Sequence, residues 1–498
     1  MPILIEPIRR HCFATLIHSP MVLTRKAAPA SSAIYRRFSA RAPHLQARAD
    51  TADRSCVKYP GKRVACCAGI MAVIFLSGCR SWKSASGKSA VSNPGAAISL
   101  TMMAMVDGSN AAFENQALHK FAGERGYQIR YFPYLESTNE CLDVYRQLFQ
   151  DRSTQPDICE IDIVWPAILA DDLVDLSPYL RDEIKEFPPE LIQSFTIRGR
   201  LVAIPIYLDT GLLYYRSDLL RKYGFRKPPA TWDELGSMAK VIQAGERRSG
   251  KRDFWGFVWQ GEAGEGLTCD ALEWQSSEGG GHIIEPDGTI RVSNPRAIHA
   301  LERAVSWVGT ISPPGVVSYG EDDSVNVWRS GNAAFMRSWL FAYGSMRDLS
   351  CPVHDRFGVA LLPGGPGGRS RVLGDMAVAV SKYSKHREEA VAAIRDLTSA
   401  DNEAVRARQA GSVPTRSMLQ NRLDIMDHTP FRGLLAEDVL TGIVARPSVI
   451  TGRSYDAVSR AYSAAVHSAL TRQVSPRDAL AALEKQLVRI TGLRPSRN

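Results

Sequence analysis

Two aspartates at the ends of strand-like runs are the residues of this chain best suited to chemistry. Asp162 lies in residues 160–166 (EIDIVWP), and Asp209 lies in residues 204–216 (IPIYLDTGLLYYR). A carboxylate pair can cleave a glycosidic bond if one member keeps its proton and the two stand roughly 5–9.5 Å apart. Each carboxylate can equally hold a ligand by accepting two hydroxyl groups. Two structural roles also fit, since Asp162 would cap a helix and Asp209 would stabilise a turn at Thr210 and Gly211.

Other signatures of enzyme chemistry are missing. The sequence contains no G-x-S-x-G nucleophile elbow and no H-E-x-x-H motif. Residues 87–89 match the end of a phosphate-binding loop, but Trp82 stands where that loop needs its first glycine. The ten histidines form no cluster, and no Cys/His spacing indicates zinc. We therefore expect neither a metal nor a cofactor.

The net charge of +9 belongs to the N-terminal stretch alone. Residues 1–79 carry twelve Lys or Arg and three Asp or Glu, so the other residues are balanced. The 498-residue chain is 45% hydrophobic and 23% charged, which is typical of globular proteins. A basic patch for phosphates is not supported, and no nucleic-acid partner is expected.

Residues 62–79 have the order of a secretory signal. Lys62 and Arg63 precede a 13-residue apolar run, Val64 to Leu76. As a helix this run would span about 20 Å, short of the ~30 Å hydrocarbon core of a bilayer. Residues 76–79 (LSGC) resemble the bacterial lipoprotein box, which implies lipidation of Cys79. A buried hydrophobic helix ending at a glycine is the alternative.

The flanks of this signal fit an exported protein. Residues 1–56, rich in Arg, Ala and Ser, look like a transit peptide or like an extension before a true start near Val57. We therefore assign residues 1–78 to an N-terminal extension with a signal peptide. Residues 79–97 are rich in Ser, Gly and Ala and are expected to form a flexible tether.

Four cysteines follow Cys79 and leave two interpretations open. They would form two disulfides, with three possible pairings, or remain single buried thiols. They are Cys141, Cys159, Cys269 and Cys351.

Strand-like and helix-like runs alternate through the remaining chain. This alternation predicts an α/β fold with a largely parallel sheet, followed by a mostly helical part from His386 onward. The predicted strands are residues 98–106, 128–133, 158–164, 201–206, 212–215, 357–362 and 376–380. The predicted helices are residues 113–126, 141–149, 232–243 and 295–308.

Three stretches together carry a family resemblance: residues 160–166, residues 204–216 and residues 331–339 (GNAAFMRSW). Shorter pieces support them at residues 229–235 (PATWDEL), 379–385 (AVSKYSK) and 411–416 (GSVPTR). In order and spacing they resemble the extracellular solute-binding proteins of bacterial ABC transporters, in the sugar-binding family that includes the trehalose/maltose-binding type. The resemblance covers roughly residues 98–490.

This resemblance implies a two-lobed periplasmic-binding-protein fold of type II, with hinge strands and a ligand cleft between the lobes. Residues 98–206 and 340–396 would form lobe 1, and residues 207–339 and 397–498 would form lobe 2. The expected crossings lie near residues 205–209, 335–339 and 397–401. The lobes would close on the ligand by a hinge motion.

The resemblance also implies which side chains meet the ligand. Aromatic rings suit the C–H faces of a sugar, while carboxylates and Arg suit its hydroxyls. Tyr207 and Trp339 could equally be core residues, and Arg337 could pair with an acid between the lobes. The implied ligand residues are Asp162, Asp209, Tyr207, Trp339, Arg416, Trp259, Trp274, Arg337, Tyr343 and Glu114.

Three positions depart from the family pattern. Met376 stands where a stacking tryptophan is common, Asp375 adds a carboxylate, and Cys141 replaces a common arginine. A methionine packs against a ring face but offers no flat π surface. We therefore include Asp375 and Met376 among the expected ligand residues, with an amino sugar, a polyol or a cationic solute as further ligand classes.

The function implied is that of a binding protein rather than an enzyme. We expect a lipid-anchored monomer in the periplasm or on the cell surface that delivers a sugar, or a sugar-like solute, to an ABC permease and its ATPase. A secreted carbohydrate-active enzyme and a solute sensor with the same fold are the alternatives.

Overall fold

The computed structural model describes residues 97–105, 108–133, 135, 137–346, 348–420, 422–426 and 442–496. All of them belong to one compact unit, Ala90–Asn498. The predicted signal, the lipidation site Cys79 and nearly all of the predicted tether lie outside these residues. No helix in the described part is long and apolar enough to cross a membrane.

A five-stranded sheet forms the centre of the first lobe, in the order β2-β1-β3-β12-β6. Buried residues of these strands, mostly Leu, Ile, Val, Met and Ala, join the core of this lobe. β1 pairs in parallel with β2 and β3, whereas β12 runs antiparallel to β3 and β6. The strands are β1 (Ser99–Met103), β2 (Gln128–Tyr131), β3 (Ile158–Asp162), β6 (Ile204–Tyr207) and β12 (Met376–Val380).

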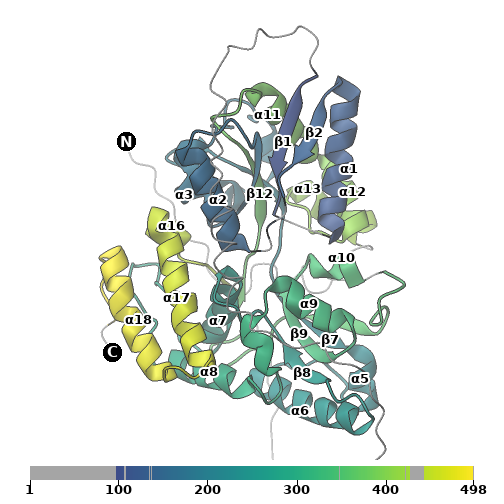
Figure 1. Ribbon diagram of the computed structural model, residues 1–498, viewed down its shortest axis with the longest axis vertical. Helices are drawn as coiled ribbons and strands as arrows, with labels where there is room; N and C mark the ends of the chain where they lie inside the picture. The colour runs from purple at the N-terminus through teal and green to yellow at the C-terminus, as the bar shows by residue number, and fades with distance from the viewer. Residues whose placement is uncertain are drawn as a thin grey trace, which may run out of the picture. The chain divides into compact units, whose positions relative to one another are not determined.

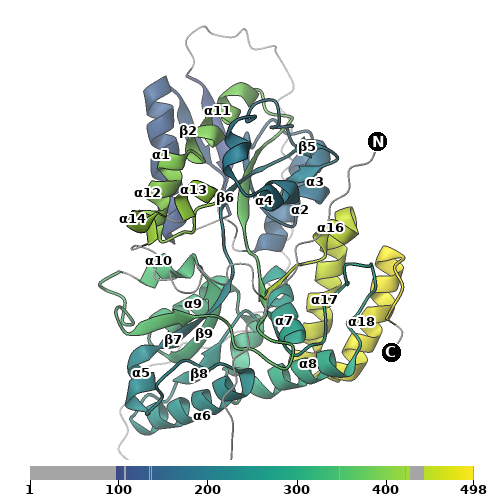
Figure 2. The same cartoon turned by 180° about the vertical axis from the view of Figure 1, so that it is seen from behind.

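Helices cover both faces of this sheet (Figures 1 and 2). The second of them begins at a capping serine, since Ser137 accepts the N–H of Glu140. The helices are α1 (Gly108–Arg125), α2 (Thr138–Gln150), α3 (Pro166–Leu169), α4 (Pro189–Ser194), α11 (Arg387–Leu397), α12 (Ala400–Ala410), α13 (Ser417–Gln420) and α14 (Leu423–Met426). A short hairpin of β4 (Thr196–Ile197) and β5 (Arg200–Leu201) adds to this lobe.

A four-stranded sheet, in the order β10-β7-β9-β8, forms the centre of the second lobe. Only β8 and β9 are parallel in it. Its strands are β7 (Gly211–Arg216), β8 (Trp255–Val258), β9 (Ala333–Trp339) and β10 (Phe357–Ala360). Its helices are α5 (Ser217–Lys222), α6 (Trp232–Arg248), α7 (Glu265–Ser277), α8 (Pro295–Trp307), α9 (Glu321–Arg329) and α10 (Ala342–Met346).

The C-terminal helices return to the second lobe. They are α16 (Ser448–Thr451), α17 (Tyr455–Leu470) and α18 (Pro476–Thr491). Apolar residues of α17 and α18 join the core that α7 and α8 build. Figures 1 and 2 show α16 and the start of α17 reaching up beside α2 and α3 of the first lobe. The helices at this end of the chain therefore touch both lobes.

The predicted lobe boundaries need two corrections. β10 pairs with β7, so residues 340–372 do not return to the first sheet as predicted. The return comes after the short strand β11 (Arg371–Val372), which pairs with β13 (Ile443–Val444). The helix α12 packs on α1 of the first lobe, so the crossing predicted at residues 397–401 is also misplaced. Strand pairing and helix docking over long sequence separations, which local patterns do not encode, decide both boundaries.

The chain first passes from one sheet to the other between β6 and β7. β6 ends at Tyr207 in the first sheet, and β7 begins at Gly211 in the second. The prediction of a largely parallel sheet is only partly right, because in the first sheet it holds only for β2, β1 and β3 and in the second only for β8 and β9. The strand β12 enters the first sheet from the second lobe, and it therefore runs opposite to β3.

Candidate functional site

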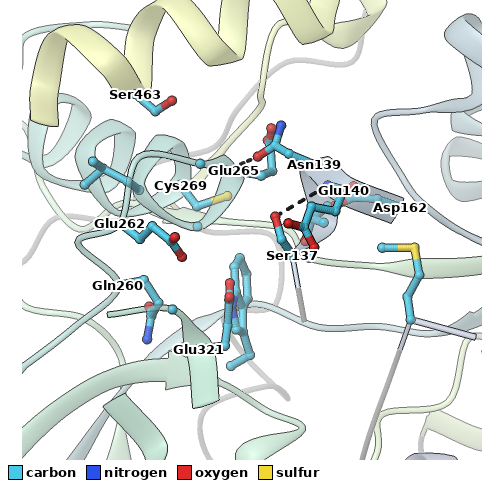
Figure 3. Close-up of a pocket in the computed structure, with 18 of the residues that line it drawn as sticks. Ser137, Asn139, Glu140, Asp162, Gln260, Glu262, Glu265, Cys269, Glu321 and Ser463 are labelled. Atoms are coloured by element: carbon cyan, nitrogen blue, oxygen red, sulfur yellow. Dashed lines mark hydrogen bonds between the residues drawn. The ribbon is translucent and has the colours of Figure 1, made fainter. Parts of the chain in front are cut away.

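A cleft of about 580 Å³ lies between the two sheets. The first lobe contributes the start of α2 and the ends of three strands, and the second contributes the loop before α7, the start of α9 and the end of β9. Figure 3 shows the carboxylates of Glu140, Glu262 and Glu321 directed into this space. The charged side chains in its lining are Glu140, Asp143, Asp162, Asp209, Glu262, Glu265, Glu321, Asp322, Asp323, Arg446 and Arg460.

Five of the predicted ligand residues line the cleft, and three of these form a row across the first sheet. Met376 starts β12 and is paired with Asp162 at the end of β3 and with Tyr207 at the end of β6. Trp339 ends β9, where it pairs with Gly211 at the start of β7. Strand ends are where α/β sheets place ligands. The fifth residue is Asp209, in the crossing between the lobes.

Asp162 is held by an arginine that the sequence analysis missed. Arg446 Nη2 and Nη1 donate to the two carboxylate oxygens of Asp162 at 2.8 and 3.2 Å. Nη1 also donates to Glu265 Oε1 at 2.8 Å, and Nη2 donates to the carbonyl of Leu373 at 2.9 Å. Asp162 belongs to the first lobe and Glu265 to the second, so one buried guanidinium joins both walls. No local motif marks Arg446, which follows a two-residue strand.

The other acceptor sites of Glu265 are also in use. Its carboxylate accepts the hydroxyls of Tyr455 and of Ser459, the latter at 2.6 Å. Its backbone N–H donates to Asn139 Oδ1 at 3.0 Å, a bond that joins α2 to the start of α7 (Figure 3). These bonds hold the backbone and the carboxylate of Glu265 in place in the wall of the cleft.

Asp209 lies at the edge of the cleft. It stabilises the turn there, which is one of the roles that the sequence allowed. Its Oδ1 accepts the N–H of Thr210 and of Leu340, both at 2.7 Å. Asp375 in turn accepts the N–H of Asp209 at 2.8 Å. Burial raises the pKa of both carboxyls to about 7. Asp375 does not line the cleft. Its carboxylate instead accepts a hydrogen bond from the segment that crosses between the lobes.

Trp339 lies on a buried charged group. The guanidinium carbon of Arg337 is 4.0 Å from the centroid of its ring. Arg337 itself does not line the cleft, since it is fully buried against Asp270 and Glu273 of α7. The predicted acid partner of Arg337 therefore exists, although it lies within the second lobe rather than between the lobes.

Two other predicted aromatic residues belong to the core of the second lobe. The rings of Trp259 and Trp274 meet edge to face, with centroids 5.0 Å apart. Both are fully buried, and Trp259 Nε1 donates to Ser312 at 3.0 Å. Neither lines the cleft, because large apolar side chains on the inner faces of packed elements supply the core first.

Three further predicted ligand residues also lie outside the cleft lining. Arg416 is buried beside Phe187, donates to the carbonyl of Thr398 at 2.7 Å and pairs with Glu186. Tyr343 belongs to α10 and packs near Gly411. Glu114 is buried in α1, where burial raises its pKa to about 7. Arg416 is outside the lining because α12, which precedes it, packs on α1 of the first lobe.

The two lobes also meet along α2 and α17. Arg460 Nη2 lies 2.9 Å from both carboxylate oxygens of Asp143, and Arg146 Nη1 lies 2.7 Å from Asp456 Oδ2. Arg460 also pairs with Asp456 at 2.8 Å. These four side chains form an interlobe ion-pair group beside the cleft.

Neither a metal cluster nor a disulfide is found among the described residues. No group of three or more His, Cys, Asp or Glu in this part of the chain is arranged to hold a metal ion. The four described cysteines are free and buried, which answers the open question in favour of single thiols. Cys141, the position of the expected arginine, packs in the first core.

Comparisons with known proteins agree with this geometry. The family described as "Bacterial extracellular solute-binding protein" matches residues 133–404. A "Probable ABC transporter-binding protein" of Deinococcus radiodurans is 44% identical over 374 residues, which cover 75% of this chain and 89% of that protein. A "Mannitol-binding protein" of Pseudomonas aeruginosa is 26% identical over 177 residues, covering 35% of this chain and 39% of that protein.

Solved structures extend the comparison to the fold. Maltose-bound MalE3 of T. maritima superposes with a TM-score of 0.74 and 36% identity, covering 79% of this chain and all of that one. A mannitol-bound solute-binding protein of Agrobacterium vitis gives a TM-score of 0.68 at 21% identity, covering 79% and 98%. The second likeness concerns the fold alone.

Proposed function

This chain belongs to the bacterial extracellular solute-binding protein family, and from that membership we propose that it binds a sugar between its lobes and delivers it to the permease of an ABC importer. The relatives are binding proteins of transporters, not enzymes. The output of such a protein is a change in lobe position that a membrane partner recognises.

One observation carries this proposal. The row of Asp162, Met376 and Tyr207 at the edge of the first sheet faces the cleft that Trp339 lines from the second. A carboxylate and a phenol can bond hydroxyls, while an indole ring covers a C–H face. The volume of about 580 Å³ lies within the range of small-molecule sites.

The arrangement of the carboxylates supports binding rather than catalysis. A glycosidase needs one free general acid and one free nucleophile or base. Here Asp162 is engaged by Arg446, and Asp209 is engaged by backbone N–H groups. We expect Arg446 and Asp162 to act together as a polar anchor for sugar hydroxyls, with Glu262 and Glu321 as further acceptors.

Related proteins suggest the first ligands to try. Maltose occupies the T. maritima protein, and mannitol occupies the Agrobacterium vitis protein. We expect a disaccharide such as maltose to bind more tightly than an acyclic polyol, because Trp339 offers a flat surface to a ring.

Lipid anchoring through Cys79 is part of the same proposal. It rests on the charged, apolar and small residues of positions 62–79. A monomer held at the membrane by this lipid would present its cleft to the transmembrane subunits. Mass spectrometry of the mature protein from a bacterial membrane fraction would detect the modified cysteine, and an unmodified residue there would contradict the anchor.

The experiment is a ligand screen with matched variants. Maltose, mannitol, glucosamine and a polyamine are titrated into the purified protein, followed by thermal shift and calorimetry. Ligand at a hundred times its Kd should add about 2.7 kcal/mol of stability. Asp162→Asn and Trp339→Ala should each reduce this gain, while Trp255→Ala, a tryptophan outside the cleft, should keep it. No shift with any sugar or polyol would contradict the proposal.

A further inference from the structure

Trp339 is an aromatic residue of the cleft that neighbouring groups hold on several sides. It is the last residue of β9, and Arg337 stands two positions earlier on the same strand. Side chains two apart on a strand point to the same side, which places the guanidinium beneath the indole. The 4.0 Å between the guanidinium carbon and the ring centroid is a cation–π stack.

The guanidinium under this ring cannot turn. Arg337 Nε and Nη2 donate to the two carboxylate oxygens of Glu273 at 3.0 and 2.8 Å. Nη1 donates to Gln260 Oε1 at 3.1 Å, and Asp270 Oδ1 lies 2.7 Å from Nε. Arg337, Asp270 and Glu273 are all fully buried. A guanidinium held on three arms presents one fixed plane.

Two more contacts hold the edge of the indole. The Trp339 side chain donates a hydrogen bond to Glu321 at the start of α9. On another side, a Cβ atom at Gly374 would stand 2.7 Å from Cζ3 of Trp339. Gly374 belongs to the segment that returns to the first lobe, so only a glycine there leaves room for the ring.

This support is expensive for stability alone. Two carboxylates and one guanidinium without solvent exposure lose their hydration, and well-packed apolar residues often serve a core as well or better. The group lies directly behind the cleft residue Trp339, so a role in shaping the cleft explains its presence better than a role in folding.

We infer that Arg337 is a positioning residue that holds Trp339 in one orientation, ready to receive the ring face of a cyclic sugar. This inference rests on the proposed function for its ligand, and it adds which buried residue sets the affinity. A ring preset in one orientation loses little conformational freedom on binding, and affinity rises accordingly. An acyclic polyol, which lacks a flat face, gains little from the same preset ring.

The test is a double-mutant cycle with maltose and mannitol as probes. Arg337→Lys keeps the charge but cannot form the flat stack or the bidentate pair. We expect it to weaken maltose binding about tenfold and mannitol binding about twofold or less. In a Trp339→Ala background the same change should cost no further affinity. An equal loss in both backgrounds would overturn the inference, because Arg337 would then act through the fold.

A second variant guards against misfolding of Arg337→Lys. Gly374→Ala leaves every buried charge intact and places a methyl group against the Trp339 ring, so it should also weaken maltose more than mannitol. Unchanged maltose affinity in a folded Gly374→Ala protein would contradict the inference.

Near-ultraviolet circular dichroism of the ligand-free protein separates this inference from the proposed function. The Trp339 signal is obtained by subtracting the spectrum of Trp339→Phe. It should weaken in Arg337→Lys even if no sugar binds, whereas an unchanged Trp339 signal would overturn the inference. If the wild-type protein binds no sugar but Arg337→Lys still changes the Trp339 signal, the proposed sugar ligand is rejected. The inference that Arg337 holds Trp339 is then retained.

Discussion

Arg446 donates to both carboxylate oxygens of Asp162, at 2.8 and 3.2 Å, although 284 positions separate the two residues in the chain. The same guanidinium reaches Glu265 of the opposite lobe. The polar centre of the cleft is therefore an internal ion group that spans both walls. Any ligand that opens or tightens the cleft must act on these bonds.

Removing this arginine should destabilise the protein strongly. Arg446→Met leaves two buried carboxylates facing each other without a cation, which typically costs about 3–5 kcal/mol. Chemical denaturation measures the loss, and maltose affinity should fall with it. Arg453→Met is the control, since Arg453 forms an exposed pair with Asp171 and should cost about 0–1 kcal/mol. Equal losses in the two variants would contradict the assignment.

The ion pairs between α2 and α17 should affect closure more than folding. Arg460 and Asp143 are both substantially exposed, so their pair contributes little to stability. A contact between lobes is nevertheless lost whenever the lobes separate. We expect Arg460→Gln to weaken maltose binding by up to about fivefold and to reduce its dependence on salt. Lys185→Gln, which removes an exposed pair within the first lobe, should change neither.

The stability should fall as pH rises toward neutrality. Burial raises the pKa of Asp209 and Asp375 to about 7 from an ordinary value near 3.8. The folded protein thus binds protons that the unfolded chain releases between about pH 4 and 7. By linkage, the contribution of these groups to the free energy of unfolding declines across that interval and levels off above it.

Asp375→Asn tests this pH dependence. The amide oxygen still accepts the N–H of Asp209, but the carboxyl is gone, and so is its charge beside Asp162 and Arg446. The decline of Tm between pH 5 and 8 should become shallower in this variant. Asp401→Asn, at the exposed start of α12, should keep the wild-type slope. A wild-type slope in Asp375→Asn would show that other groups cause the decline.

Arg416 should matter for stability and not for the ligand. It was expected in the cleft, yet it is buried between Thr398 and Glu186 and outside the cleft lining. Arg416→Met leaves the carbonyl of Thr398 without this donor and should cost about 2 kcal/mol. The Kd for maltose should remain within about twofold of wild type. A large loss of affinity in a folded variant would place Arg416 at the site after all.

The hydrophobic pattern was sufficient to predict the five strands of the first sheet, but it missed β8 and β9 of the second. Residues 376–380 form the predicted strand. Residues 232–243 lie within the helix Trp232–Arg248, which Thr231 caps by accepting the N–H of Glu234. Asp162 does end a strand and line the cleft, whereas Asp209, which was also expected at the end of a strand, lies between β6 and β7. These features depend on periodicity, capping and strand ends, which are written in neighbouring residues.

The tertiary structure alone decided which segments meet. Strand β10 joins the second sheet because it pairs with β7, and α12 stays with the first lobe because it packs on α1. Arg446 lies in the cleft because a late segment of the chain passes between the lobes. Arg416 lies outside it because α12, the helix before it, stays with the first lobe. Trp259 and Trp274 were implied as ligand residues, but packing within the second lobe places them in its core. Local sequence specifies a strand or helix, whereas pairing between distant segments depends on how the apolar faces of the whole chain are buried together.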